Sequence, residues 1–137
     1  MREILFKAKR LDNGEWVKGD LWQDKDLEQY YISGWNYYTA DSGLEREPYL
    51  HEVYASTVCQ YIGIRDRNND RIFENDIIRF VDYRGKTREL PVTWNPNHGV
   101  FCVWVDGATF YGVNKYLSND IVVIGNINDA VGFRSKK

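Results

Sequence analysis

The sequence predicts a mainly β protein with at most one or two short helices. Aromatic residues make up 15% of its 137 residues, including five Trp and ten Tyr, and bulky rings favour pleated sheets over helices. Short apolar or alternating runs recur about every 8–12 residues between turn-forming residues, which is the spacing of a sandwich or barrel. Hydrophobic residues at 43% and charged residues at 28% are typical of a folded domain with a buried core.

The length fits one domain or two small, closely packed halves. We expect a β-rich N-terminal half over residues 1–60 and a C-terminal half over residues 61–137, packed as one compact unit. Five short strands between Asp76 and Ile127, joined by tight turns, predict a small SH3-like barrel in the C-terminal half. The strands at 59–64 and 121–127 are apolar throughout, so we expect the two halves to share a sheet that is covered on both faces.

The N-terminal half begins with a predicted hairpin at Asn13-Gly14, because both positions tolerate positive φ. In its second strand Val17 and Leu21 share one face, and Trp16, Lys18, Asp20 and Trp22 share the other. Five further elements are expected in this half: a polar loop at 23–28, two short strands within 30–39 hinged at Ser33-Gly34, a strand at 49–53, and one helical turn at 55–57. Residues 40–48, ADSGLEREP, are charged and turn-rich, and we expect them to be the least structured part of the chain.

The turns of the C-terminal half are marked more clearly in the sequence. Gly-containing turns are predicted at 84–86, 95–99 and 106–107. The strands that they separate are expected at 76–83, 87–94, 100–105, 108–113 and 121–127. Residues 113–120 are the best helix candidate in the chain.

The segment TVCQYIGIRDRNNDRIFENDII at 57–78 carries the most specific pattern. Asp66, Asn68 and Asp70 occupy the first, third and fifth positions of a possible calcium loop. The match then fails, because Arg71 stands where a Gly is needed and Ile77 where a bidentate Glu is needed. Asp and Asn side chains also bond nearby backbone amides, so the segment predicts a chain reversal between a strand ending at residue 64 and one starting near residue 72.

This segment resembles the signature of the YopX-like family of phage and prophage proteins, which runs roughly T-V-x-Q-Y-T-G-L-x-D-K-N-G-x-E-I-Y-E-G-D-I-V. The opening REILFKAKR and the closing VVIGNINDA are similar to the family's end segments, so the resemblance spans nearly the whole chain. Asn69 and Asn75 replace glycines of the pattern, and Asn tolerates positive φ, so the turns are expected to persist. The matching residues are Thr57, Val58, Gln60, Tyr61, Gly63, Asp66, Asn68, Ile72, Glu74, Asp76 and Ile77.

The resemblance implies a phage-encoded, mostly β protein that works in a bacterial cytoplasm, and it implies no reaction. The motif itself offers strand residues, turn formers and an Asp placed to bond backbone amides, and no catalytic residue. Ile62 and Phe73 replace a Thr and a Tyr of the pattern, and both suit a strand.

Composition and spacing exclude several other classes. No apolar run approaches the roughly 18 residues of a membrane span, and the N-terminus lacks a signal-peptide core, so we expect no membrane and a cytoplasmic location. Cys59 and Cys102 lie in apolar runs and are expected to be buried free thiols. No cofactor and no metal is expected: there is no phosphate-binding loop, His51 and His98 lie far from both cysteines, and the acidic cluster at 66–76 is expected to be solvated turns.

Two groups of residues are candidate binding sites. A basic hairpin tip could follow a phosphate backbone and stack a base, although charges also keep edge strands soluble; it comprises Tyr83, Arg84, Lys86 and Arg88. A ring cluster within YYISGWNYYT suits either a protein contact or an aromatic core; it comprises Tyr30, Tyr31, Trp35, Tyr37 and Tyr38.

Two functional hypotheses follow. In the first, the chain is a non-enzymatic phage or prophage accessory protein that forms a homo-oligomer or binds a host or phage protein through the ring cluster. In the second, it is a nucleic-acid-binding β-barrel module that uses the basic tip. The net charge of −2 and pI of about 5.7 disfavour the second, because general nucleic-acid binders are usually basic.

Overall fold

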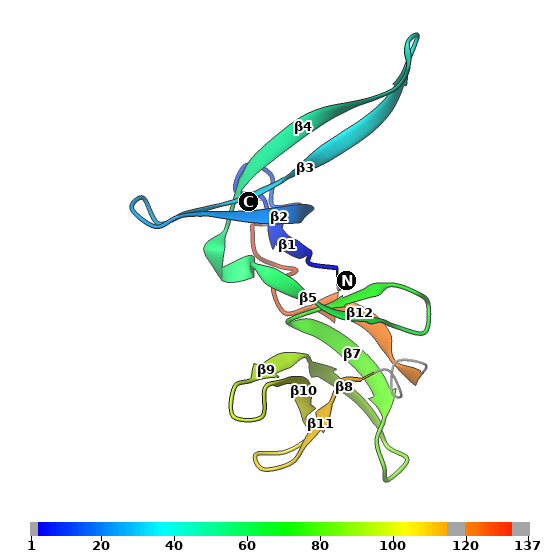
Figure 1. Cartoon of the computed structure of the whole chain (residues 1–137). Helices are drawn as coiled ribbons and strands as arrows, with labels where there is room; N and C mark the ends of the chain where they lie inside the picture. The colour runs from blue at the N-terminus through cyan, green and yellow to red at the C-terminus, as the bar shows by residue number, and fades with distance from the viewer. Residues whose placement is uncertain (1–2, 115–119, 133–137) are drawn as a thin grey trace, which may run out of the picture. The chain divides into compact units, whose positions relative to one another are not determined.

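The computed structural model of the chain describes residues 3–114 and 120–132 (Figure 1). They form two compact units, one made of residues 4–58 with 131–132 and the other of Glu3 with residues 59–130. We call these the N-terminal and C-terminal units. Nearly all regular structure in the described residues is β-strand, which confirms the predicted fold class. None of the helical segments described has the length or apolar character needed to span a membrane.

The N-terminal unit is built on four antiparallel strands in the order β4-β3-β2-β1. The predicted hairpin at Asn13-Gly14 is confirmed, with Gly14 at φ 70° and Ala8 opposite Val17. An isolated bridge between Arg10 and Val53 brings the end of β1 to the end of β4. The elements are β1 (Phe6–Lys9), β2 (Trp16–Asp24), β3 (Gln29–Ala40), β4 (Gly43–Val53) and the 3-10 turn η1 (Ala55–Thr57).

One face of this sheet forms the core of the N-terminal unit. Ala8, Ile32 and Val53 are buried there, and five partly buried residues pack against them: Phe6, Val17, Leu21, Tyr30 and Val58. The predicted pairing of Val17 with Leu21 on one face is therefore confirmed. The predicted helical turn is also confirmed, since the Thr57 hydroxyl accepts a hydrogen bond from the backbone N–H of Lys9 and donates one to the carbonyl of Tyr54.

Two expectations for this unit are wrong. Residues 40–48 are not the least structured part of the chain, because the chain turns at Asp41-Ser42 and continues as β4 from Gly43. All eleven residues of β4 pair with β3, from Ala40↔Gly43 to Tyr30↔Val53. The expected hinge at Ser33-Gly34 is also absent, and β3 runs through it unbroken. In these segments, cross-strand pairing outweighs the preference of the individual residues for turns.

Gly34 keeps β3 continuous by leaving room for a ring. The directly opposite residue is Tyr49, and a Cβ at Gly34 would lie 2.2 Å from the Tyr49 hydroxyl. That hydroxyl donates a hydrogen bond to the Lys18 carbonyl on β2. The glycine is therefore needed for contact between neighbouring strands, and not for bending.

The C-terminal unit contains two three-stranded antiparallel sheets, β12-β7-β8 and β11-β10-β9, and the pair β5–β6. Eight buried side chains form its core: Ile62, Ile72, Ile78, Phe80, Val92, Val103, Val113 and Ile121. Cys59 and Cys102 are buried and form no disulfide in the described residues, as predicted. The strands are β5 (Cys59–Arg65), β6 (Arg71–Phe73), β7 (Asp76–Val81), β8 (Thr87–Pro91), β9 (Thr93–Asn95), β10 (Val100–Trp104), β11 (Phe110–Gly112) and β12 (Val122–Asn126).

Several details of the C-terminal half stay predictions. The pairings in the described residues form open sheets, and the SH3-like barrel remains an expectation. The helix expected at 113–120 falls mostly on residues 115–119, which lie outside the described residues. The division at residue 60, and the packing of the halves as one compact unit, also stay predictions.

The chain reversal predicted at 57–78 is confirmed. β5 ends at Arg65 and β6 begins at Arg71, and Asn69 and Asn75 have φ of 67° and 68°. One oxygen of Asp66 accepts hydrogen bonds from the backbone N–H groups of Asn68 and Asp70, and the other accepts one from Val123 on β12, each at 2.9 Å. The Asp66 carboxylate thus ties the motif loop to the last strand.

Replacing Gly34 by Ala is expected to lower the free energy of unfolding by about 1–2 kcal/mol, because the new methyl group displaces the Tyr49 ring. Chemical denaturation measures the loss. Gly112→Ala is a matched control, since nothing lies within 4 Å of a Cβ at Gly112 in β11. In a Tyr49→Ala background the Gly34 substitution should cost much less; an unchanged cost would show that the ring is not the obstacle.

Replacing Asp66 by Ala is expected to lower the free energy of unfolding by about 2–3 kcal/mol, because three amides in and beside the loop lose their acceptor. The control is Asp70→Ala, whose side chain is exposed in the same loop. The comparison uses denaturation midpoints and slopes. Equal, small losses for both variants would contradict a tying role for Asp66.

Candidate interaction surface

The face of the β2–β3–β4 sheet away from the core is rich in exposed apolar side chains. The register places Trp22 opposite Tyr31, Ser33 opposite Leu50, and Trp35 opposite Pro48. Directly paired residues of antiparallel strands point to the same side. The exposed members are Trp22 at 61%, Trp35 at 47%, Tyr37 at 63%, Leu44 at 74% and Leu50 at 61%.

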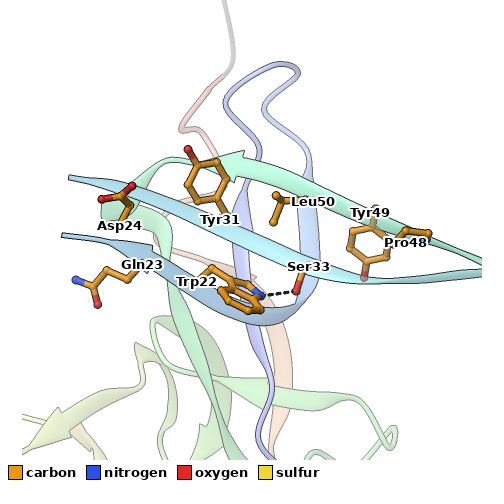
Figure 2. A pocket seen from close by; sticks show the side chains of 8 residues that line it. All are labelled: Trp22, Gln23, Asp24, Tyr31, Ser33, Pro48, Tyr49 and Leu50. Atoms are coloured by element: carbon orange, nitrogen blue, oxygen red, sulfur yellow. Dashed lines mark hydrogen bonds between the residues drawn. The ribbon is translucent and has the colours of Figure 1, made fainter. Parts of the chain in front are cut away.

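We call this surface the apolar face: Trp22, Tyr31, Ser33, Trp35, Tyr37, Leu44, Arg46, Pro48 and Leu50. Ser33 lies in it among larger neighbours, so its small side chain leaves a hollow of about 540 Å³, mostly apolar, that Trp22, Tyr31, Tyr49 and Leu50 help to line (Figure 2). The Trp22 Nε1–H donates a hydrogen bond of 2.7 Å to the Ser33 hydroxyl. That bond fixes the indole at the edge of the hollow.

Beyond Ser33, β3 has only β4 as a partner in the described residues, because the pairing of β2 with β3 ends at Asp20↔Ser33. Residues 34–40 and 43–49 therefore form a two-stranded ribbon that extends from the rest of the N-terminal unit (Figure 1). We call this ribbon the arm. Two-stranded hairpins are marginally stable in water. An arm of this length is expected to gain stability when another surface covers it.

The two faces of the arm differ in chemistry. On the apolar face, the Arg46 guanidinium lies 3.9 Å from the centre of the Trp35 ring. The opposite face carries Asn36, Tyr38, Glu45 and Glu47, as the pairs Tyr38↔Glu45 and Asn36↔Glu47 show. A stacked guanidinium is weakly hydrated and compatible with burial, whereas carboxylates are costly to bury.

The base of the arm is held by Tyr49. Its hydroxyl donates to the Lys18 carbonyl, and burial raises the pKa of this hydroxyl, with a smaller contribution from the negative charge of Asp20. A raised pKa keeps the donor protonated. The Tyr49 ring also stacks with His51 on β4, with ring centres 5.6 Å apart.

The predicted ring cluster is divided between the two sides of the sheet. Tyr30 packs against the core of the N-terminal unit, and its hydroxyl accepts a hydrogen bond from Gln23. Tyr31, Trp35 and Tyr37 lie on the apolar face, whereas Tyr38 lies on the opposite face of the arm. Sequence reasoning missed Trp22, Leu44 and Leu50 as surface members. The alternation of Trp22 with the core residue Leu21 was the available signal.

The basic tip lies in the turn between β7 and β8, where an acidic side chain accompanies its cations. One oxygen of Asp82 accepts hydrogen bonds from the backbone N–H groups of Arg84 and Lys86. Arg88 donates to the Val105 carbonyl and lies 3.9 Å from the Asp82 carboxylate. The Arg84 guanidinium lies over the ring of Tyr83, which is exposed. The Arg88 guanidinium is therefore engaged within the fold.

A family model described as YopX protein matches residues 5–130. The chain belongs to the YopX family. The crystal structure of protein EF1440 from Enterococcus faecalis is similar, with a TM-score of 0.56 and 18% identity over 95% of this chain and 96% of that one. At this identity the likeness shows the fold alone. A search of the curated proteins finds no match.

The Asp82 turn gives a pH-dependent prediction. Hydrogen bonds from the Lys86 and Arg84 amides, with the charges of Arg88 and Arg84, lower the pKa of Asp82 below its ordinary value of 3.8. A lowered pKa in the folded state contributes stability that is present above pH 3.8 and is lost as the pH falls through the folded pKa. At neutral pH, Asp82→Asn should therefore unfold more easily than the wild type.

The two proteins should converge in stability at a pH below the folded pKa of Asp82. Urea denaturation at a series of pH values measures the difference. Glu89→Gln, on the adjacent strand and paired with Arg79 on the surface, serves as the control. The stability difference between Asp82→Asn and the wild type could also persist unchanged at the lowest pH. In that case the carboxylate charge is not the source of the difference.

Proposed function

We propose that this YopX-family protein is a non-enzymatic accessory protein that acts by protein–protein association through the apolar face. Exposed apolar patches of this kind are typical of interaction sites, and aromatic residues are enriched in the cores of interfaces. The observation that carries the proposal is the continuous row of exposed Trp, Tyr and Leu side chains from Trp22 along the arm to Leu44.

The partner is a second copy of the chain, or a host or phage protein that presents a complementary apolar surface. A phage or prophage origin and action in the bacterial cytoplasm belong to the same proposal, and they rest on the resemblance of the motif at 57–78. The chemistry of the apolar face also favours binding over catalysis. Two of its polar groups, the Trp22 Nε1–H and the Ser33 hydroxyl, are engaged in a hydrogen bond with each other.

Nucleic-acid binding through the basic tip is the alternative function. Tyr83 and Lys86 are exposed there, and a ring beside cations suits single-stranded nucleic acid. Against it stands the position of Asp82, whose carboxylate lies beneath the turn and close to Arg88. Sedimentation velocity recorded at two wavelengths, on protein purified without nuclease, separates the two functions in one experiment.

Tyr37→Ser should weaken self-association by about tenfold, because an aromatic anchor is lost from the apolar face. Tyr38→Ser is the matched control, since Tyr38 is the adjacent residue on the opposite face of the arm. Sedimentation velocity over a concentration series measures both variants. If the wild type stays monomeric throughout, self-association is excluded, and a salt-sensitive peak that carries nucleic acid would instead support the basic tip.

A further inference from the structure

Four exposed side chains of the apolar face, two on β3 and two on β4, are symmetrically spaced. Their centre is the cross-strand pair Asn36↔Glu47, which lies next to the middle pair of the arm, Tyr37↔Arg46. On β3, Trp35 and Tyr37 lie one residue to either side of this pair. On β4, Leu44 and Leu50 lie three residues to either side of it. A surface with this spacing presents the same pattern when it is turned end for end.

We propose that the apolar face of one arm packs against the apolar face of the arm of a second copy, antiparallel, about a two-fold axis at the Asn36↔Glu47 pair. This inference rests on the proposed function and names its partner and its register. In a two-fold contact each interaction occurs twice. Tyr37 of each copy then packs on Trp35 of the other, and Leu44 of each copy packs on Leu50 of the other.

The hollow beside Ser33 receives a side chain in this arrangement. End-for-end pairing places Thr39 of one copy over Ser33 of the other, and the neighbouring Leu44, paired with Thr39 across the ribbon, enters the hollow of about 540 Å³. Leu44 is the most exposed member of the apolar face, at 74%. A largely exposed leucine and an apolar hollow on the same surface are complementary features.

Charge favours this face of the arm over the other. Pairing through the opposite face would bring Glu45 and Glu47 of two copies together, and like charges in contact are unfavourable. On the apolar face the charged group within the arm is Arg46, which already stacks on Trp35. Arg46 lies one residue from the proposed axis, where its flat, stacked guanidinium is weakly hydrated and compatible with a largely apolar contact.

The surface area that two arms would bury indicates how tightly they should associate. Fully buried aromatic side chains contribute about 150–250 Å² each, so the partly exposed rings and leucines leave on the order of 500 Å² per copy. A pair of arms would therefore bury about 1,000 Å², at the low end for specific interfaces. The association should be reversible and depend on concentration, and its best test traps the pair covalently.

The test uses two single substitutions, Ser33→Cys and Thr39→Cys, and a bis-maleimide linker that spans about 10 Å, the usual separation of stacked sheets. Antiparallel pairing brings position 33 of one copy over position 39 of the other. Each position lies about 20 Å along the arm from its own counterpart, six residues at roughly 3.4 Å each. A mixture of the two variants should cross-link, and neither variant alone should do so.

The native cysteines should contribute little background to the cross-linking experiment. Cys59 and Cys102 are buried, so wild-type protein treated in the same way is the reagent control. One variant carries a longer tag, so that a mixed dimer is distinguished by mass. Leu44→Ser should raise the dissociation constant of the pair at least about tenfold and abolish the cross-link. Leu27→Ser, at a leucine that is 65% exposed in the β2–β3 turn and outside the arm, should change neither.

The outcomes separate this inference from the proposed function. Cross-linking of Thr39→Cys with itself would mean parallel arms and would overturn the antiparallel register. A wild type that associates while the mixture stays uncross-linked would also overturn it, and would leave association through another part of the apolar face standing. A wild type that is monomeric at every concentration would remove both this pairing and self-association.

Discussion

The packing of the Tyr49 ring against Gly34 is the contact on which the exposed arm depends. The pairing of β2 with β3 ends at Ser33, so the residues of β3 that follow no longer have β2 as a neighbouring strand. Tyr49 spans this point, because its ring covers Gly34 and its hydroxyl reaches the Lys18 carbonyl on β2. Three strands are joined by one side chain where the sheet narrows to two. The arm therefore starts from a fixed base, which lets its exposed side chains keep a defined register.

The C-terminal unit is organised by a different device, the acidic or amide side chain that accepts hydrogen bonds from its own turn. Asp66 and Asp82 each accept from two amides of the loop that follows them, and Asp106 and Asn95 do the same in the later turns. Asp76, which is buried, accepts from the Phe73 amide and from Asn126 of β12. Asp66 and Asp76 of the family motif are thereby accounted for as structural residues.

The parts of the fold that could be read from the sequence are those set by local chemistry. Asn69 and Asn75 mark turns because few residues tolerate positive φ. Val17 and Leu21, which alternate with polar or exposed residues and share one face, mark a half-buried strand. Residues 40–48 could not be read in this way. Their Asp, Ser, Gly and Pro are typical of loops, and their strand conformation comes from eleven consecutive pairs with β3. Pairing with the preceding strand leaves no signal in the composition of a charged segment.

The candidate surface shows the same difference between features set by local sequence and features set by strand pairing. It also explains why the apolar face is favoured over the basic tip as the binding site. The ring cluster was visible as a run of aromatic residues, but Trp22, Leu44 and Leu50 join it only through register, from two other strands. At the basic tip, by contrast, the fold supplies partners for Arg88: the Asp82 carboxylate is close to it, and the Val105 carbonyl accepts a hydrogen bond from it. The apolar side chains of the arm receive no comparable cover within the N-terminal unit as described. Water contact with so many rings and leucines is unfavourable, and a partner surface would relieve it.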